Sequence, residues 1–153
     1  MKKLSVIILV SILSFSLMSC SDDDSNEEPN NSITDGEWKL VGLILNGNDV
    51  TSSQLNECNL RNTYLFREDN TFIFTSHNEE QNSDSCTSDT ESGVWRDVTK
   101  DADPALIAAF DGKDIEDDEE RLNFRIVDGV LRETVYERNS DGTRETFFYL
   151  YEK

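Results

Sequence analysis

The feature that most constrains the fold is the C-terminal region, where alternating apolar segments are separated by turn signals. The segments RLNFRIV (121–127), VLRETVYER (130–138) and TRETFFYLYE (143–152) are joined by Asp128-Gly129 and by NSDG. Alternation with a period of two is typical of strands with one buried face. An Asp-Gly pair between two such runs is a strong hairpin signal. The region is therefore predicted to form three antiparallel strands.

The preceding part of the chain continues this pattern with shorter segments. We predict five more strands, at 36–47, 62–67, 71–76, 92–98 and 103–110. The last of these also fits a helix start, because Asp103 and Pro104 suit an N-cap and a first helical position, but its context favours a strand. We interpret residues 77–91 as a polar loop, and residues 48–58 as a polar stretch with room for one helical turn.

Eight strands joined mostly by hairpins predict an all-β fold, an up-and-down antiparallel barrel. Closing the sheet removes its unpaired edges, and the interior then holds side chains or one small ligand. A sandwich of seven or eight strands is the alternative. The length of the last three strands favours a barrel wall that curves around a pocket.

The N-terminus has the order of a secretory signal peptide over residues 1–19. Lys2 and Lys3 precede an apolar stretch, 4–18, that is short for a membrane-spanning helix. Leu17 to Cys20 resemble the lipobox of bacterial lipoproteins, which implies acylation of Cys20, as by palmitate, and attachment to a lipid bilayer. A retained anchor helix and an ordinary Cys20 are the alternatives.

Residues 20–32 follow as an acidic segment with no apolar residue after Cys20. Such a segment cannot bury enough surface to fold, so we expect a disordered tether. It resembles the acidic export tag that sends some lipoproteins to the outer face of the outer membrane. A plain linker, and a periplasmic location, are the alternatives. Residues 33–153 then form one domain.

The net charge of −18 limits the partners that the chain can bind. A surface this negative repels the phosphate backbone, so we expect no nucleic-acid binding. Basic protein partners and cations remain allowed, although solubility alone explains such a charge. We expect a monomer.

Cys58 and Cys86 remain as one pair once Cys20 is assigned to lipid. In a chain exported to an oxidising compartment, we predict that they form a disulfide. A reactive thiol is the alternative. No histidine, basic residue or CxxC spacing near either cysteine supports it.

Several short motifs occur in an order that resembles the lipocalin-like domain family of small bacterial lipoproteins. They are Gly36 and Trp38, Cys58, Tyr64 and Phe66, Asp69 to Phe72, Cys86, Gly93 and Trp95, and Phe147 to Tyr151. The resemblance covers nearly the whole domain and implies a lipocalin-like barrel that binds a small apolar molecule. The acidic segment 111–120 and the sequence DADPALIAAF depart from the family pattern at the expected barrel mouth.

Aromatic side chains are the candidates for the lining of a ligand cavity, or equally for a closed barrel core. The candidates are Trp38, Tyr64, Phe66, Phe72, Phe74, Trp95, Phe124, Tyr136, Phe147 and Tyr149.

The sequence holds no set of residues that predicts catalysis. His77 is the only histidine, and its place at a strand end indicates an exposed residue. We predict no catalytic residue, no metal site and no cofactor. The acids of 111–120 lack the EF-hand order and are interpreted as a solvated charge run, with calcium binding as the alternative.

These observations predict a surface-exposed lipoprotein whose barrel binds a small apolar or amphipathic ligand without catalysing a reaction. The alternative function is an interaction module that docks a basic partner on its acidic surface.

Overall fold

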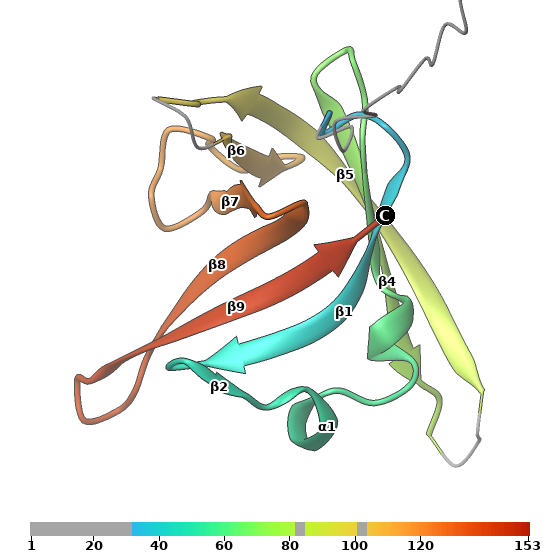
Figure 1. Ribbon diagram of the computed structural model, residues 1–153, viewed down its shortest axis with the longest axis vertical. Coiled ribbons are helices and arrows are strands. Elements are labelled where there is room, and N and C mark those ends of the chain that lie inside the picture. Colours follow the sequence, from blue (N-terminus) through green and yellow to red (C-terminus); the bar gives the residue numbers. More distant parts are fainter. Residues whose placement is uncertain (1–31, 82–84, 101–103) are drawn as a thin grey trace, which may run out of the picture.

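The computed structural model describes residues 32–81, 85–100 and 104–153, which form a single antiparallel sheet with short helical turns (Figure 1). The elements are β1 (Glu37–Leu45), β2 (Asn48–Asp49), α1 (Thr51–Gln54), the 3-10 turn η1 (Asn59–Arg61), β3 (Thr63–Phe66), β4 (Thr71–Glu79), β5 (Cys86–Asp97), β6 (Ala105–Phe110), β7 (Leu122–Val127), β8 (Val130–Arg138) and β9 (Arg144–Glu152). The prediction that Cys20 is lipidated lies outside the described residues, as do the predicted signal peptide and nearly all of the tether.

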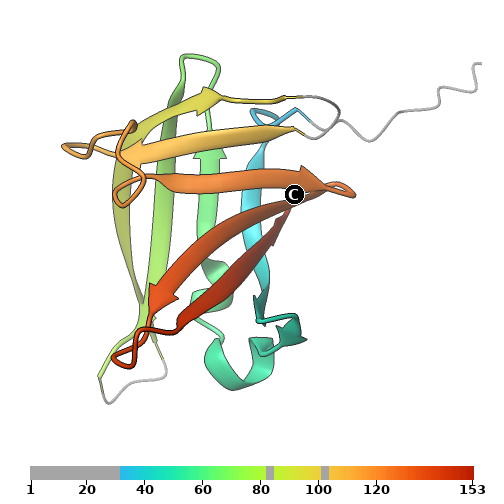
Figure 2. The same ribbon diagram turned by 90° about the vertical axis from the view of Figure 1, so that its left-hand side faces the viewer.

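The sheet closes on itself. Apart from β2, which pairs only with the end of β1, each strand pairs with the next one along the chain, and β9 pairs back with β1. The β1–β9 ladder runs from Lys39 opposite Glu152 to Leu45 opposite Phe147. The predicted eight-stranded up-and-down barrel is therefore confirmed, and the sandwich is not what forms (Figures 1 and 2).

The hairpin signals near the C-terminus are confirmed in detail. Asp128 and Gly129 connect β7 to β8 with φ angles of 53° and 80°. Two successive positive φ values are those of the mirror-image turns that match the twist of a hairpin, and Gly129 adopts its value without a steric penalty. The segment that also fitted a helix start forms a strand, β6, over Ala105–Phe110, while Asp103 lies outside the described residues.

The prediction of a loop at 77–91 is wrong. Most of this region is the extension of a long hairpin, in which Ser76 pairs with Asp89 and Glu79 pairs with Cys86. The hairpin projects beyond the barrel core, so its side chains need not alternate between apolar and polar. A strand that is solvated on both faces lacks the period-two signal on which the prediction depended.

The sheet register assigns every strand residue to the inside or the outside of the barrel. On β8, Leu131 and Glu133 are buried and point inward, whereas Arg132 and Tyr136 occupy outward positions. Tyr136 is 51% exposed. The prediction that Tyr136 belongs to the core or lines the barrel interior is therefore wrong.

One end of the barrel is filled by a packed core, and we call it the core end. Trp38, Phe66, Phe72 and Leu131 are at most 1% exposed here. The indole N–H of Trp38 donates a hydrogen bond of 2.9 Å to the carbonyl oxygen of Ile33, which holds the start of the domain against this end. Large interlocking aromatic side chains fill the barrel interior at the core end.

Gly93 shows how closely the wall packs on this core. A Cβ atom at this position would lie 2.2 Å from the carbonyl oxygen of Ala109 and 2.5 Å from the ring of Phe72. The Gly-x-Trp motif on β5 therefore has a steric cause, because only glycine allows the neighbouring strand and the Phe72 ring to approach this closely.

The opposite end is crossed by the connection between β1 and β3, residues 46–62, and we call it the disulfide end. Figures 1 and 2 place α1 at this end, away from the chain terminus marked C. Cys58 in this connection is bonded to Cys86 at the start of β5, with a Cα–Cα distance of 5.6 Å. The predicted disulfide is confirmed, and it fastens the connection to the rim of the barrel.

Candidate functional site

The predicted aromatic candidates are distributed between two layers of the barrel interior. Five of them are buried and belong to the core: Trp38, Tyr64, Phe66, Phe72 and Phe124. Three are partly buried and pack against that core: Phe74, Trp95 and Tyr149. Phe147 is also partly buried and faces inward by its pairing with Leu45.

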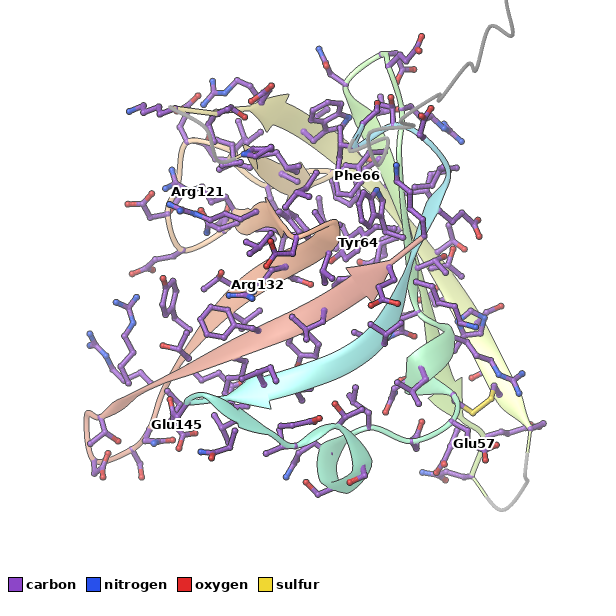
Figure 3. The ribbon with its side chains drawn as sticks, viewed as in Figure 1. Glu57, Tyr64, Phe66, Arg121, Arg132 and Glu145 are labelled. Atoms are coloured by element: carbon purple, nitrogen blue, oxygen red, sulfur yellow. A yellow bond between two sulfur atoms is a disulfide. The ribbon has the colours of Figure 1, made fainter. Side chains whose placement is uncertain are left out.

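Tyr64 is the centre of the buried layer. Its ring lies 4.6 Å from that of Phe74 in a stacked arrangement, and 5.2 Å from that of Phe124 edge to face. A second edge-to-face contact, at 5.1 Å, joins it to Tyr151. Figure 3 shows Tyr64 and Phe66 together in the interior, on the side of β4 and β1. Such pairs are favourable aromatic geometries, so this layer, which we call the floor, is well packed.

Glu133 lies in this floor and is only 6% exposed. Its Oε2 accepts a hydrogen bond of 2.9 Å from the hydroxyl of Tyr151, and a longer one of 3.4 Å from Tyr64. Burial raises the pKa of Glu133 to about 7, and the hydrogen bonds from the two tyrosines act in the opposite direction. The buried carboxyl group therefore stays protonated to a higher pH than an exposed glutamate does.

The two tyrosines respond to the same environment. Burial raises the pKa of Tyr64 and of Tyr151 well above the usual value, and the charge of Glu133 adds to the effect. Both hydroxyls consequently stay protonated and act as donors to Glu133. No described residue donates a hydrogen bond to Glu133 Oε1, so that oxygen is free for a further partner.

Sequence reasoning missed Glu133, although a signal for it exists. In VLRETVYER the apolar residues Leu131 and Val135 share one face with Glu133, while the opposite face would bring Arg132 inward. An acid between two inward apolar residues of a strand is a candidate for a buried carboxyl group. Listing Tyr136 among the core or cavity candidates instead implies the opposite face.

Above the floor, toward the disulfide end, partly buried apolar side chains line the inner wall. We call this set the apolar collar; it consists of Phe74, Phe110, Leu122, Phe147 and Tyr149. Solvent reaches part of each side chain, in contrast to the core end. The collar is therefore apolar surface that the barrel itself leaves incompletely covered.

The inner wall also has a distinctive charge pattern. By register, the inward strand positions carry acids and no lysine or arginine. The acids are Asp89, Glu91, Asp97, Glu133, Glu137 and Glu145, of which Glu133 is buried, Glu145 is partly buried and the others are exposed where their strands extend beyond the packed core. Burial raises the pKa of Tyr149, and the charges of Glu133 and Glu137 raise it further. Negative charge therefore acts on the collar. The interior thus combines apolar surface with negative charge.

The connection over the disulfide end reaches this layer. Leu55, between α1 and η1, packs against the core cluster although it is partly exposed. Cys58, three residues further along, is 4% exposed and covalently fixed. The connection therefore partly covers the collar, and any molecule that reaches the interior from this end must pass it.

The remaining candidates have structural surroundings of their own. His77 is half-buried, with its main chain held by Asn59 and Asn62, so the expectation of a fully exposed residue is wrong. The acidic segment 111–120 is held by Lys113–Glu120 and Arg96–Glu116 ion pairs. Among the described residues, no three His, Cys, Asp or Glu side chains are grouped in a way that could hold a metal ion.

A pocket of about 650 Å³ lies on the outside of the barrel, over β6, β7 and β8. Sequence reasoning did not predict it, because its wall combines outward positions of strands with residues of two loops.

The fold and the site define a class of protein, a small closed β-barrel with a packed aromatic floor at one end. Residues 34–103 match the family model of the lipocalin-like domain, which confirms the resemblance seen in the sequence. This match spans β1 to β5 of the barrel.

Among solved structures, the chain is similar to a complex of bovine odorant-binding protein with a selenium-containing odorant. The identity is 15%, the match covers 81% of this chain and 72% of that one, and the TM-score is 0.39. Comparison with curated proteins gives no match. Within the part of the chain that the structure describes, no helix has the length and apolar character needed to span a membrane.

Proposed function

We propose that this protein is a lipid-anchored binding protein whose barrel takes up a small apolar or amphipathic molecule at its disulfide end. The observation that carries the proposal is the apolar collar above Glu133. A ligand that covered the partly exposed faces of Phe74, Phe110 and Tyr149 would remove apolar surface from water.

Glu133 supports an amphipathic ligand over a purely apolar one. Its Oε2 is occupied by the tyrosines, whereas its Oε1 has no donor among the described residues. A hydroxyl or amine on the ligand would supply that donor. Because the inner wall carries acids and no basic residue, an anionic head group would be repelled there.

The anchor follows from the N-terminal sequence alone. Lipid on Cys20 and an acidic tether over 20–32 would hold the barrel at the outer face of the outer membrane. The lipobox at the end of an apolar segment supports the anchor, and the acidic run directly after it supports the outward-facing location.

We propose binding without catalysis. The interior offers Glu133 with two tyrosines, and the only histidine, His77, lies on the outward face of β4. No nucleophile is paired with a base in this group. The alternative function, docking of a basic partner, gains no support from the outer face of β7 to β9, because that face is basic.

Native mass spectrometry of residues 21–153, purified gently from the natural host, tests the proposal directly. This part holds every described contact of the fold. We expect an added small-molecule mass that disappears on denaturation. A clean apoprotein mass after mild purification, together with no uptake of any apolar probe, would refute ligand binding.

A matched pair of variants locates the site. Phe147 faces inward in the collar and Phe148 faces outward on the same strand. We expect Phe147→Ser to weaken binding of the uncharged fluorescent probe N-phenyl-1-naphthylamine about tenfold, because it removes apolar contact area. Phe148→Ser should leave the affinity unchanged. Equal effects of the two substitutions would contradict a site inside the barrel.

A further inference from the structure

The outside of β7, β8 and β9 has a charge opposite to that of the whole protein. Five of the eight arginines of the chain lie here, namely Arg121, Arg125, Arg132, Arg138 and Arg144. Across the outward strand positions from Asn123 to Leu150 there is no acid, because the glutamates of β8 and the first of β9 face inward. In a chain with 32 acidic residues, this face is an isolated positive region.

The arginines on this face are placed against one another. Arg125 pairs directly with Arg132 across β7 and β8, and Arg138 pairs with Arg144 across β8 and β9. Like charges directly opposite in an antiparallel sheet destabilise it. The sheet therefore contains two destabilising arginine pairs close together, although acids are abundant elsewhere in the chain.

Little in the protein neutralises these charges. Among the described residues, the one ion pair of the group joins Arg121 to Asp118 at 2.6 Å. The side chain of Arg125 has no hydrogen bond or ion pair with any described residue. The Nε of Arg132 is buried and lacks a hydrogen-bond partner within the described structure. The group therefore has unused donor capacity.

Aromatic rings hold two of the guanidinium groups in place. Arg144 lies over the ring of Tyr136 at 4.2 Å, and Arg132 lies over that of Phe148 at 5.3 Å. A planar guanidinium stacked on a ring keeps its edge donors free and loses little entropy when it binds an anion. This explains the exposed position of Tyr136.

Arg121, Arg125, Tyr136 and Arg144 are among the residues that line the outer pocket of about 650 Å³. Four basic side chains line it, Lys100, Arg121, Arg125 and Arg144, against a single acid, Asp118. The pocket also has an apolar part, formed by Val98, Ala105 and Ile107, of which Ile107 is only 6% exposed although it faces outward. Figure 3 shows Arg121 beside the loop that leads into β7, and Arg132 beside β8.

We propose that this outer pocket is a second binding site, specific for a small amphipathic anion. The ligand would place an apolar or aromatic body on Ile107 and Ala105, and a carboxylate, sulfonate or phosphate between Arg125 and Arg144. The guanidinium fork matches the oxygens of such groups. The volume lies within the usual range for small-molecule sites. This site is independent of the collar, whose wall is acidic and excludes anions.

The test compares two fluorescent probes on residues 21–153. The anion 8-anilinonaphthalene-1-sulfonate carries the sulfonate that N-phenyl-1-naphthylamine lacks. We expect Arg125→Gln and Arg144→Gln each to weaken binding of the anion about tenfold, the loss typical of one charge-assisted hydrogen bond. Binding of the uncharged probe should stay the same. High salt should weaken binding of the anionic probe only.

Controls separate this proposal from the interior site. Arg61→Gln makes the same change in charge on η1, outside the residues that line the pocket, and should leave both probes unaffected. Arg144→Lys, which keeps the charge but loses the fork, should show an intermediate loss. Near-ultraviolet circular dichroism confirms the fold of each variant. If the anion's affinity falls in Phe147→Ser but not in the arginine variants, the outer pocket does not bind it and the proposal is overturned.

Discussion

The hydroxyl of Tyr151 donates a hydrogen bond of 2.9 Å to Oε2 of Glu133, joining β9 to β8 inside the barrel. The contact places an ionisable group in the aromatic floor, where a carboxylate is poorly solvated. It therefore links the stability of the barrel to pH.

Glu133 should make the protein less stable as pH rises from about 4.5 to about 7. Burial raises the pKa of Glu133 from an ordinary value of 4.5 to about 7 in the folded protein, so the folded state binds more protons in this window than the unfolded state does. The stability that protonated Glu133 contributes is fully present below the unfolded-state pKa and is lost as the pH rises through the folded-state pKa. For a fully buried group, this difference amounts to about 3 kcal/mol.

Glu133→Gln, which cannot ionise, should remove that pH dependence. We expect the variant to be about 2 to 3 kcal/mol more stable than the natural protein at pH 8 and similar to it at pH 4.5. Urea unfolding at several pH values measures the effect. Glu137→Gln, on the same strand but exposed, is the control and should keep the natural curve. Parallel curves for Glu133→Gln and the natural protein would show that Glu133 is not the responsible group.

Gly93→Ala should destabilise the barrel by about 3 kcal/mol, the upper part of the usual range for overpacking. The added methyl group would meet the carbonyl oxygen of Ala109 at 2.2 Å, and backbone cannot easily move away. Val94→Ala, at the exposed next position, should change stability by less than about 0.5 kcal/mol. Thermal and urea unfolding compare the two. A mild effect at Gly93 would mean that β5 and β6 can separate locally.

Removal of the Cys58–Cys86 disulfide should cost about 3 to 4 kcal/mol, because the bond closes a loop in the unfolded chain. The sequence separation is 28 residues. The double substitution of both cysteines by alanine, and reduction of the natural protein, should give the same loss in urea unfolding. Reduction of the double variant is the control and should have no effect. We also expect faster release of N-phenyl-1-naphthylamine, because the connection over the disulfide end is no longer fastened.

Much of the barrel was predictable because its strands follow local rules. The Asp128-Gly129 turn and the alternation on either side of it predict the last three strands, and the structure has strands at these places. The 77–91 region was mispredicted because a hairpin without a buried face has no apolar periodicity.

The candidate site was less predictable, because it depends on which face of each strand turns inward. Listing Tyr136 as an interior candidate implies the wrong face of β8, whereas Leu131 implies the face that turns Glu133 inward and the arginines outward. Nor does sequence reveal which aromatic residues are fully packed and which form the collar. Whether an inward aromatic residue is fully packed or belongs to the collar depends on how far it lies from the core end.

Cys20→Ser should abolish membrane attachment, because serine cannot form the thioether that carries the lipid. We expect the natural chain in the membrane fraction of a lipoprotein-processing host, with a mass raised by acylation, and the variant without added lipid. Intact-mass measurement after fractionation checks both. Ser19→Ala, which keeps a small residue before Cys20, is the control and should remain lipidated. Lipid-free natural protein would contradict the lipobox interpretation.

Arg125→Glu should stabilise the fold while it destroys the outer pocket. The substitution replaces a like-charge pair with an opposite-charge pair facing Arg132, worth about 0.5 kcal/mol in an antiparallel sheet. A double-mutant cycle with Arg132→Gln isolates the pairwise contribution. We expect a positive coupling in stability together with loss of 8-anilinonaphthalene-1-sulfonate binding. A residue that weakens the fold but holds an anion is kept for binding. A variant that gained stability and still bound the anion would show that Arg125 is not needed for anion binding.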